Sequence, residues 1–349
     1  MTPVQTGSRE ETHRRADDFS APARSLLVTE REERAVTVEP EFLSRADPYR
    51  RELLAHCYRM LGSVHDAEDL VQETYLRAWR AYDRFEGRST VRTWLYRIAT
   101  SACLTALEGR GRRPLPTGLG GPSERAGEPL EQRTEVPWLE PLPTEEDPAA
   151  IVTSRESTRL AFIAALQHLP PRQRAVLILR DVLAWRAAEV AELLDTSTAA
   201  VNSALQRARA QLEQVAPTPD AVTEPATERT RDLLARYVDA FERKDVDGIV
   251  ALLTEDAVWE MPPFATWFLG RDAVGRHLLG QCPGGPGDFR LVSTTANGAP
   301  ALGLYLRGED DAFHPFCLQV LTVTGDAFSH VVSFFDHRLF DTFQLPSRA

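Results

Sequence analysis

The sequence lacks the features of a membrane or secreted protein. No apolar run among its 349 residues approaches the roughly 20 residues that a membrane-spanning helix needs. The polar segment 1–40 has no apolar core of signal-peptide length. We therefore expect a cytoplasmic protein without membrane insertion. The four cysteines lie far apart and form no CxxC pair, which argues against a zinc site or a disulfide framework. We expect neither a metal nor a cofactor.

Lysine is nearly absent, with Lys244 alone beside 39 arginines, and the net charge of −11 hides a local asymmetry. Segments 41–113 and 151–215 carry net charges of +3 and +2, whereas 114–150 and 216–349 carry −6 and −8. Because contacts with nucleic acid depend on local charge, the overall sign does not exclude DNA binding.

Proline and glycine divide the chain into segments of different character. Between residues 109 and 150 lie eight prolines and six glycines, which no helix tolerates. Helical periodicity is strong before this stretch and returns after it, and an α+β pattern with several strands follows a second proline cluster. We expect six segments. In chain order they are a disordered extension (1–40) with a short helix near 25–35, a helical domain (41–110), a linker (111–150), a second helical domain (151–215), a second linker (216–227) and an α+β domain (228–349).

Two local patterns place the helices that matter most. An apolar stripe from Ala67 to Tyr82 predicts an amphipathic helix whose N-terminus is capped by Ser63. A further helix is expected at 91–107. Near the end of the second helical domain, two helices are separated by the three residues 195–197, which is the spacing of a helix-turn-helix with Ser197 as the N-cap.

These helices carry sequences that resemble the sigma-70 family of transcription initiation factors. Region 2 of that family is similar to Asp66–Thr74 (DAEDLVQET), to 85–88 (FEGR) and to 93–99 (TWLYRIA), and region 4 to 169–174 (LPPRQR), 189–194 (EVAELL) and 201–209 (VNSALQRAR). A linker replaces region 3, as in the extracytoplasmic-function sigma factors. The tail is similar to the SnoaL-like domains fused to some of these factors, on 259–263 (WEMPP) and 267–271 (WFLGR). The resemblance implies a multidomain protein with two all-α sigma domains and a C-terminal α+β cone-shaped barrel.

The resemblance also implies three binding surfaces. The polar face of the first helix is assigned to core RNA polymerase: Asp69, Gln72, Glu73, Arg77 and Arg80. Opening the −10 element extrudes a base, which aromatic platforms and cations can stabilise, and the candidates are Arg84, Phe85, Arg88, Arg92, Trp94 and Arg97. The last helix is suited to the major groove of the −35 element through Thr198, Ala199, Asn202, Ser203, Arg207 and Arg209.

The sequence departs from the family pattern at two places. Family members often carry asparagine near position 101, where this chain has Ser101-Ala102-Cys103, so the reading of the −10 element stays open. Trp185 stands where many relatives carry a small residue, which predicts a different packing of the first helix of the helix-turn-helix.

The acidic linker and the tail admit more than one role. The resemblance threads the linker through the polymerase cleft and RNA exit path, and a passive tether is the alternative. SnoaL-like relatives include acid–base enzymes, and the tail holds six candidates for that chemistry: Asp256, Glu260, His314, His330, Asp336 and His337. Four aromatic residues can line a pocket or fill the core, which we favour: Trp259, Phe264, Trp267 and Phe268.

The sequence as a whole predicts a non-catalytic initiation factor with a C-terminal regulatory domain that docks on the sigma domains or the linker. Core RNA polymerase and promoter DNA are the expected partners, and an anti-sigma factor or a small ligand of the C-terminal domain stays open. The alternatives are a ligand-responsive repressor and a small-molecule isomerase or cyclase fused to DNA-binding helices.

Overall fold

The first helical domain is a bundle of four helices, and the predicted N-terminal cap of one of them is present. The computed structural model describes residues 40–124, 127, 129–144, 159–215 and 228–349, so the predictions for the N-terminal extension and for 216–227 fall outside the described residues. Four helices form the bundle, called region 2 from here on: α1 (Pro40–Ala46), α2 (Arg50–Leu61), α3 (Val64–Ala81) and α4 (Val91–Ala106). The Ser63 hydroxyl accepts from the Asp66 N–H at 3.1 Å, which confirms the predicted cap.

The second helical domain, called region 4, contains the predicted helix-turn-helix. Its elements are α6 (Leu160–Leu166), α7 (Pro171–Leu177), a π-helical turn (Ile178–Val182), α8 (Ala187–Leu193) and α9 (Thr198–Val215). The Ser197 hydroxyl accepts from the Ala200 N–H at 3.2 Å, so the predicted cap of α9 is also confirmed. Asp195 has a φ of +50° in the turn between α8 and α9.

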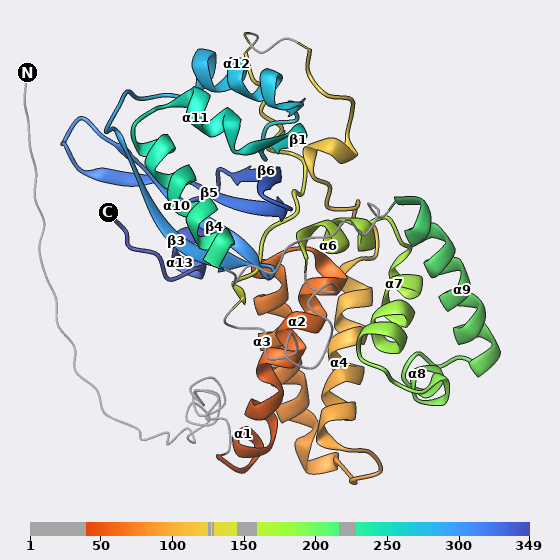
Figure 1. Cartoon of the computed structure of the whole chain (residues 1–349). Helices are drawn as coiled ribbons and strands as arrows, with labels where there is room; N and C mark the ends of the chain where they lie inside the picture. The colour runs from red at the N-terminus through yellow and green to blue at the C-terminus, as the bar shows by residue number, and fades with distance from the viewer. Residues whose placement is uncertain (1–39, 125–126, 128, 145–158, 216–227) are drawn as a thin grey trace, which may run out of the picture. The chain divides into compact units, whose positions relative to one another are not determined.

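The C-terminal domain is built on one mixed sheet (Figure 1). Its helices are α10 (Glu228–Glu242), α11 (Val246–Ala251), α12 (Arg271–Gln281) and α13 (Arg338–Thr342). Its strands are β1 (Leu253–Glu260), β2 (Trp267–Leu269), β3 (Phe289–Ala296), β4 (Ala299–Arg307), β5 (Phe313–Thr324) and β6 (Ala327–Phe334). The strand order is β2-β1-β6-β5-β4-β3, with β1 and β6 parallel and the other neighbours antiparallel. The sequence did not predict β2 or α13.

One apolar core joins helices and strands of this domain. Leu233 and Tyr237 of α10 and Leu278 of α12 are buried together with Trp259 of β1 and Phe328 of β6. This arrangement confirms the predicted combination of all-α domains with a C-terminal α+β domain. Among the described residues, no helix is both long and apolar enough to cross a bilayer.

The described part of the linker lies on the folded domains rather than extending away from them. It contains no α-helix between 111 and 144, as its prolines predict, and one 3₁₀ turn, η3 (Pro116–Gly118). Two isolated bridges, between Gln132 and Phe264 and between Pro143 and Ala296, join it to the C-terminal domain. The acidic residues 145–147 lie outside the described residues.

Candidate polymerase, promoter and interdomain sites

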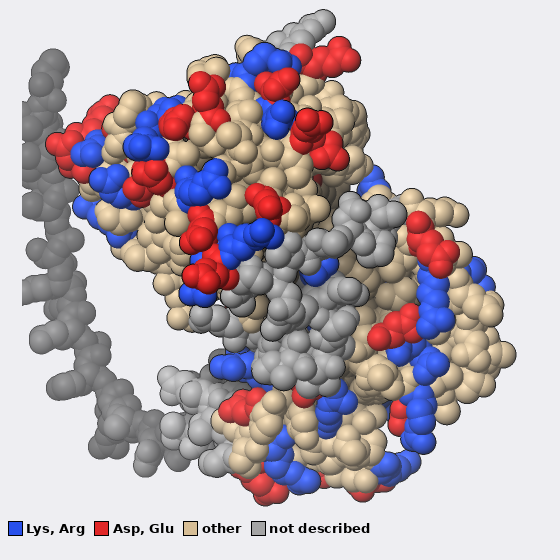
Figure 2. Space-filling model, viewed as in Figure 1, with Lys and Arg blue, Asp and Glu red and all other residues tan. Residues whose placement is uncertain are grey.

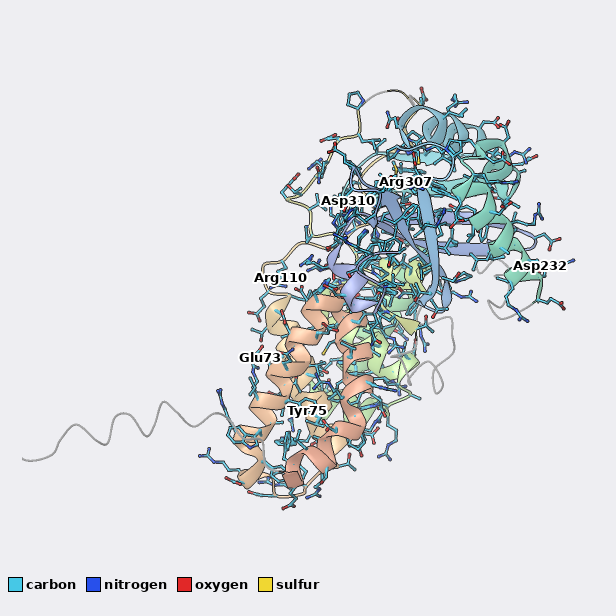
Figure 3. All side chains as sticks on the ribbon, turned by 90° about the vertical axis from the view of Figure 1, so that its left-hand side faces the viewer. Glu73, Tyr75, Arg110, Asp232, Arg307 and Asp310 are labelled. Carbon is cyan, nitrogen blue, oxygen red and sulfur yellow. The ribbon has the colours of Figure 1, made fainter. Side chains whose placement is uncertain are left out.

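The proposed polymerase face of α3 is exposed as the sequence predicts. Asp69, Gln72, Arg77 and Arg80 are exposed, and Glu73 is half-buried. Figure 3 shows Glu73 on the outer side of the region 2 helices, where it forms an ion pair of 2.6 Å with Arg77. Leu76, which the sequence pattern did not indicate as a binding residue, lies among these polar groups with its side chain 40% exposed.

The candidates for the −10 element divide into exposed and engaged side chains. Phe85 and Trp94 pack against each other with ring centroids 4.7 Å apart and ring planes tilted by 31°, and both remain half-buried rather than joining the core. Arg84 and Arg88 are exposed, and Arg88 forms an ion pair with Glu86 at 2.6 Å.

Two further −10 candidates are held by protein groups. Arg92 donates to the Glu52 carboxylate at 2.7 Å, and its guanidinium lies over the Tyr96 ring. Arg97 donates to the main-chain carbonyl of Glu192, at the end of α8, at 3.1 Å. A phosphate that contacts either side chain would share the guanidinium group with a partner inside the protein.

Region 4 is packed directly against region 2. Trp185 is buried and its ring lies 5.4 Å from that of Tyr96 in α4. Arg174 is also buried and donates to the main-chain carbonyl of Met60. Burial lowers the pKa of Arg174 to about 10. The buried guanidinium and the buried indole hold the two regions together.

The face of α9 proposed for the −35 element is open. All six candidates, from Thr198 to Arg209, are exposed. Arg207 donates to the Ser203 hydroxyl at 2.7 Å, and Arg209 makes two hydrogen bonds to the Asp181 carboxylate at 2.7 and 2.8 Å. Figure 2 shows acidic and basic side chains interleaved over the surface, including the helices of region 4. DNA would have to compete with Asp181 for Arg209.

The linker binds region 2 at the start of α3. Glu140 is the centre of this contact: its N–H donates to the Gly62 carbonyl at 3.0 Å, and its carbonyl accepts from the Tyr58 hydroxyl at 2.7 Å. Its carboxylate accepts from the Ser63 hydroxyl at 2.7 Å and lies 2.9 Å from His65 Nδ1. Gly62 has a φ of +71°, and an added Cβ there would lie 2.8 Å from the Leu139 side chain. Glycine at 62 therefore lets the linker approach.

The linker also hydrogen-bonds to the edge of the C-terminal sheet. Its Ser123 and Arg133 N–H groups donate to the carbonyls of Trp267 and Pro263, at 2.7 and 2.8 Å. In return, the Ala265 N–H donates to a linker carbonyl at 3.0 Å. Trp267 belongs to β2, the edge strand of this sheet, whereas Pro263 and Ala265 lie in the loop between β1 and β2. An edge strand offers unpaired main-chain groups for pairing of this kind.

Of the six acid–base candidates in the C-terminal domain, Glu260 and His330 meet inside it. Glu260 is fully buried, and its carboxylate lies 2.7 Å from His330 Nε2 and accepts from the linker's Thr117 N–H at 2.7 Å. His314 instead pairs with Asp310 at 2.8 Å. Of the remaining three, Asp256 and His337 are exposed, and the Asp336 carboxylate forms an ion pair.

The four aromatic candidates divide in the same way. Trp259 and Phe268 are buried in the core, as favoured from the sequence. Phe264 and Trp267 are half-buried and meet the linker, with the Trp267 indole N–H donating to the Gly120 carbonyl at 2.9 Å.

The turn between β3 and β4 connects the linker and region 2. Asn297-Gly298 is the sequence typical of a tight hairpin turn, and Asn297 has a φ of +53°. Its side chain is almost fully buried: the amide oxygen accepts from the Leu142 N–H and the amide nitrogen donates to the Tyr58 hydroxyl, both at 2.9 Å. Region 2, the linker and the C-terminal domain therefore meet at one buried asparagine, which the sequence analysis did not single out.

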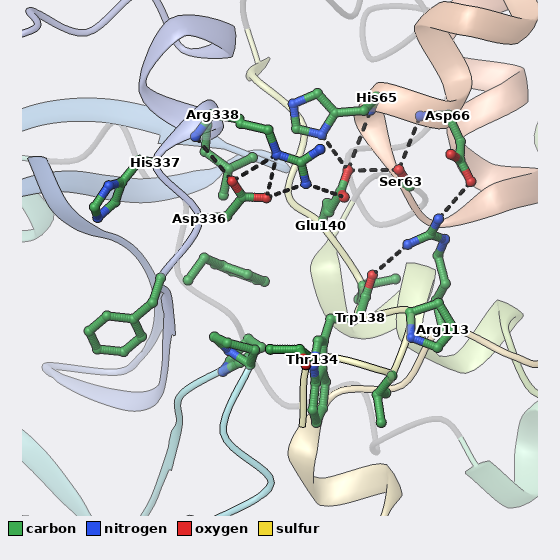
Figure 4. A pocket seen from close by; sticks show the side chains of 18 residues that line it. Ser63, His65, Asp66, Arg113, Thr134, Trp138, Glu140, Asp336, His337 and Arg338 are labelled. Atoms are coloured by element: carbon green, nitrogen blue, oxygen red, sulfur yellow. Dashed lines mark hydrogen bonds and ion pairs between the residues drawn. The ribbon is translucent and has the colours of Figure 1, made fainter. Parts of the chain in front are cut away.

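A cavity of about 690 Å³ lies at this junction (Figure 4). Apolar groups, including Trp138 of the linker and Phe335 after β6, line one part of it. A polar wall is formed by His65, Glu140 and Asp336, which have one ligand-type atom each within 4.8 Å of one another. Arg338 binds Asp336 at 2.6 Å and lies 3.9 Å from Glu140. Burial raises the pKa of Asp336, but the hydrogen bonds and charge of Arg338 outweigh it and hold that pKa below its usual value.

Comparisons with known proteins agree with this architecture. Residues 46–113 match the family described as Sigma-70 region 2, 159–212 match Sigma-70, region 4, and 234–335 match the SnoaL-like domain. The chain is 56% identical to the ECF RNA polymerase sigma factor SigG of Mycobacterium tuberculosis over 342 residues, which cover 96% of this chain and 91% of SigG.

A second mycobacterial relative supplies an experimental fold for comparison. The chain is 32% identical to the sigma factor SigJ over 259 residues, covering 71% of this chain and 75% of SigJ. The crystal structure of SigJ matches with a TM-score of 0.58 at 26% identity, covering 87% of this chain and all of that one. The chain belongs to the extracytoplasmic-function sigma factors of the sigma-70 family, which bind core RNA polymerase and direct promoter-specific transcription initiation, and it carries a SnoaL-like domain behind its sigma regions.

Proposed function

We propose that the C-terminal domain restrains this sigma factor by clamping the linker against region 2, so that the closed arrangement of regions 2 and 4 is a resting state. The clamp consists of the contacts around Glu140, the Asn297 turn and the pairing of the linker with the sheet edge. The factor works in the cytoplasm on core RNA polymerase and promoter DNA. The proposal includes no enzymatic step, since the buried Glu260 is covered by the linker's Thr117.

The observation that carries the proposal is the direct contact between regions 2 and 4. The names of the −10 and −35 elements place them about 25 base pairs apart, which is roughly 85 Å of duplex at 3.4 Å per base pair. Two domains that share the Trp185–Tyr96 contact cannot occupy both elements. The Arg97 side chain, a candidate for the −10 element, is also bound to the end of α8. Initiation therefore requires the regions to separate.

The clamp limits how far they can separate. While Thr144 stays bound at the Asn297-Gly298 turn, only 15 peptide steps connect it to Arg159 at the start of region 4. A chain of that length spans at most ~50 Å when fully extended. If the linker is released from Arg113 onward, the greatest distance that the extended chain can span to Arg159 rises to ~150 Å. Release of the linker by the C-terminal domain thus about triples the distance over which region 4 can move away from region 2.

The surfaces for polymerase and DNA belong to the same proposal. The outer face of α3 binds core polymerase, because its polar side chains face away from the bundle. The exposed first turns of α9 read the −35 element. The Phe85–Trp94 ring pair and the neighbouring arginines bind the melted −10 strand.

In vitro transcription tests the restraint directly. A chain truncated after Ala216 should still bind core polymerase and should transcribe more than the full-length protein. The full-length Trp185→Ala variant provides the matched comparison, because it weakens the contact between regions 2 and 4 and leaves the clamp in place. A loss of transcription on truncation would mean that the domain stabilises the open arrangement, and equal activity would leave the domain without a regulatory effect.

A further inference from the structure

The polar wall of the junction cavity brings together three side chains from three parts of the chain. His65 comes from the first turn of α3, Glu140 from the linker, and Asp336 from the segment between β6 and α13. Their ligand-type atoms lie within 4.8 Å of one another, and His65 Nδ1 is 2.9 Å from Glu140 Oε2. Two ligands about 2.1 Å from a tetrahedral ion are about 3.4 Å apart, so small side-chain movements would suffice to bring all three into coordination.

Both ring nitrogens of His65 have a polar neighbour: Nδ1 faces the Glu140 carboxylate, and Nε2 lies near the Thr342 hydroxyl. The Thr342 hydroxyl donates its proton to the Arg338 carbonyl at 3.2 Å and lies 3.3 Å from His65 Nε2. Nδ1 faces a carboxylate oxygen that already accepts from Ser63. The position between Nδ1 and this oxygen can hold the ring's own proton or, once that proton is released, a metal ion.

The surrounding contacts are those of oriented metal ligands. The distal nitrogen of His65 meets a hydroxyl, and Glu140 is held by a second hydroxyl and by its own main chain. Outer hydrogen bonds of this kind fix the tautomer and direction of ligands in protein metal sites. A bridging proton would explain the His65–Glu140 pair, but the convergence of Asp336 gives that pair a third donor.

Three carboxylates of the site, those of Asp66, Glu140 and Asp336, face three guanidinium groups, so a cation bound here has to replace Arg338. Asp66 is neutralised by Arg110 and Arg113. Asp336 is held by Arg338, whose side chain is 68% exposed and lies 3.9 Å from Glu140. The Arg338 side chain can turn into solvent if a metal ion replaces it at Asp336.

We propose that His65, Glu140 and Asp336 bind a divalent first-row cation of the zinc class, with its fourth position directed into the cavity. One imidazole and two carboxylates suit Zn²⁺, whereas Mg²⁺ prefers oxygen ligands and retains its waters. The bound ion joins α3, the linker and the C-terminal domain. If the clamp restrains the factor as proposed above, the ion strengthens that restraint.

Calorimetric titration of the untagged, metal-free full-length protein with ZnCl₂ tests the site. We expect one ion per chain at this site and at least a tenfold loss of affinity in Asp336→Asn and in His65→Gln. MgCl₂ in excess should not displace the ion. His314→Gln is the matched control, because His314 forms a similar pair with Asp310 on the C-terminal domain, which also carries Asp336. The affinity of this variant for Zn²⁺ should equal that of the wild type. Cys282→Ser, which removes the partly exposed thiol, should also bind normally.

Binding and regulation are separated by a second measurement. Zn²⁺ should lower in vitro transcription by the wild type and leave Asp336→Asn unaffected, and melting curves of each variant show that it is folded. No Zn²⁺ binding by the wild type, or equal affinity in wild type and both site variants, would refute the site. Binding as expected with unchanged transcription would retain the site and refute its link to the clamp.

Discussion

The buried turn at Asn297 offers the sharpest test of the clamp. Asn297→Gly removes the side chain without backbone strain, because glycine adopts the φ of +53° readily. The change deletes the hydrogen bonds to Leu142 N–H and Tyr58 Oη. Loss of a buried partner costs about 1–3 kcal/mol, and Tyr58 keeps its bond to Glu140, so we expect a total of about 2–3 kcal/mol. The closed population should then fall about 30- to 150-fold relative to the open one.

Hydrogen exchange of linker amides 129–144 measures this opening in the full-length protein. Protection of the Leu142 and Glu140 amides should fall by the same factor, and in vitro transcription should rise. Asp311→Gly is the matched control, since Asp311 also has a positive φ but is exposed in the β4–β5 turn, away from the junction. Unchanged protection in Asn297→Gly, or an equal loss in Asp311→Gly, would refute the reasoning.

Three further predictions concern the surfaces and the pH dependence. Asn202→Ala should weaken −35-dependent transcription by about 1–3 kcal/mol if Asn202 contacts a base. Arg207→Ala should weaken DNA binding at all sequences and lower the slope of log affinity against log salt concentration by about one unit. A loss confined to one promoter base in Arg207→Ala would contradict this. Charge reversal at Asp69 with Glu73 should abolish holoenzyme formation in a pull-down while the melting curve stays unchanged, and retained binding would rule out this face. Burial, and then the charge of Arg59, lower the pKa of His56 from 6.5 to about 3, so its neutral form stabilises the fold above pH 6.5. That contribution to the unfolding free energy should fall by about 1.4 kcal/mol per pH unit below 6.5, and a pH series of denaturant unfolding should show a smaller slope in His56→Gln.

The sequence by itself determined the local elements and the family. The apolar stripe of α3 repeats every three to four residues, and Ser63 and Ser197 stand one position before their helices, so short-range patterns carried these predictions. The sigma motifs lie on those helices in unbroken stretches, which made the family recognisable. The density of proline correctly predicted that the linker holds no α-helix in its described part.

Only the tertiary structure decided where the linker runs and which residues meet there. Glu140 contacts His65, 75 residues earlier, and Thr117 contacts Glu260, 143 residues later. An irregular segment has no periodicity from which a partner can be inferred, because its main-chain groups are satisfied by whichever surface the fold places beside it. For the same reason the sequence, which showed no CxxC pair, predicted no metal site, whereas folding brings His65, Glu140 and Asp336 to one wall of a cavity.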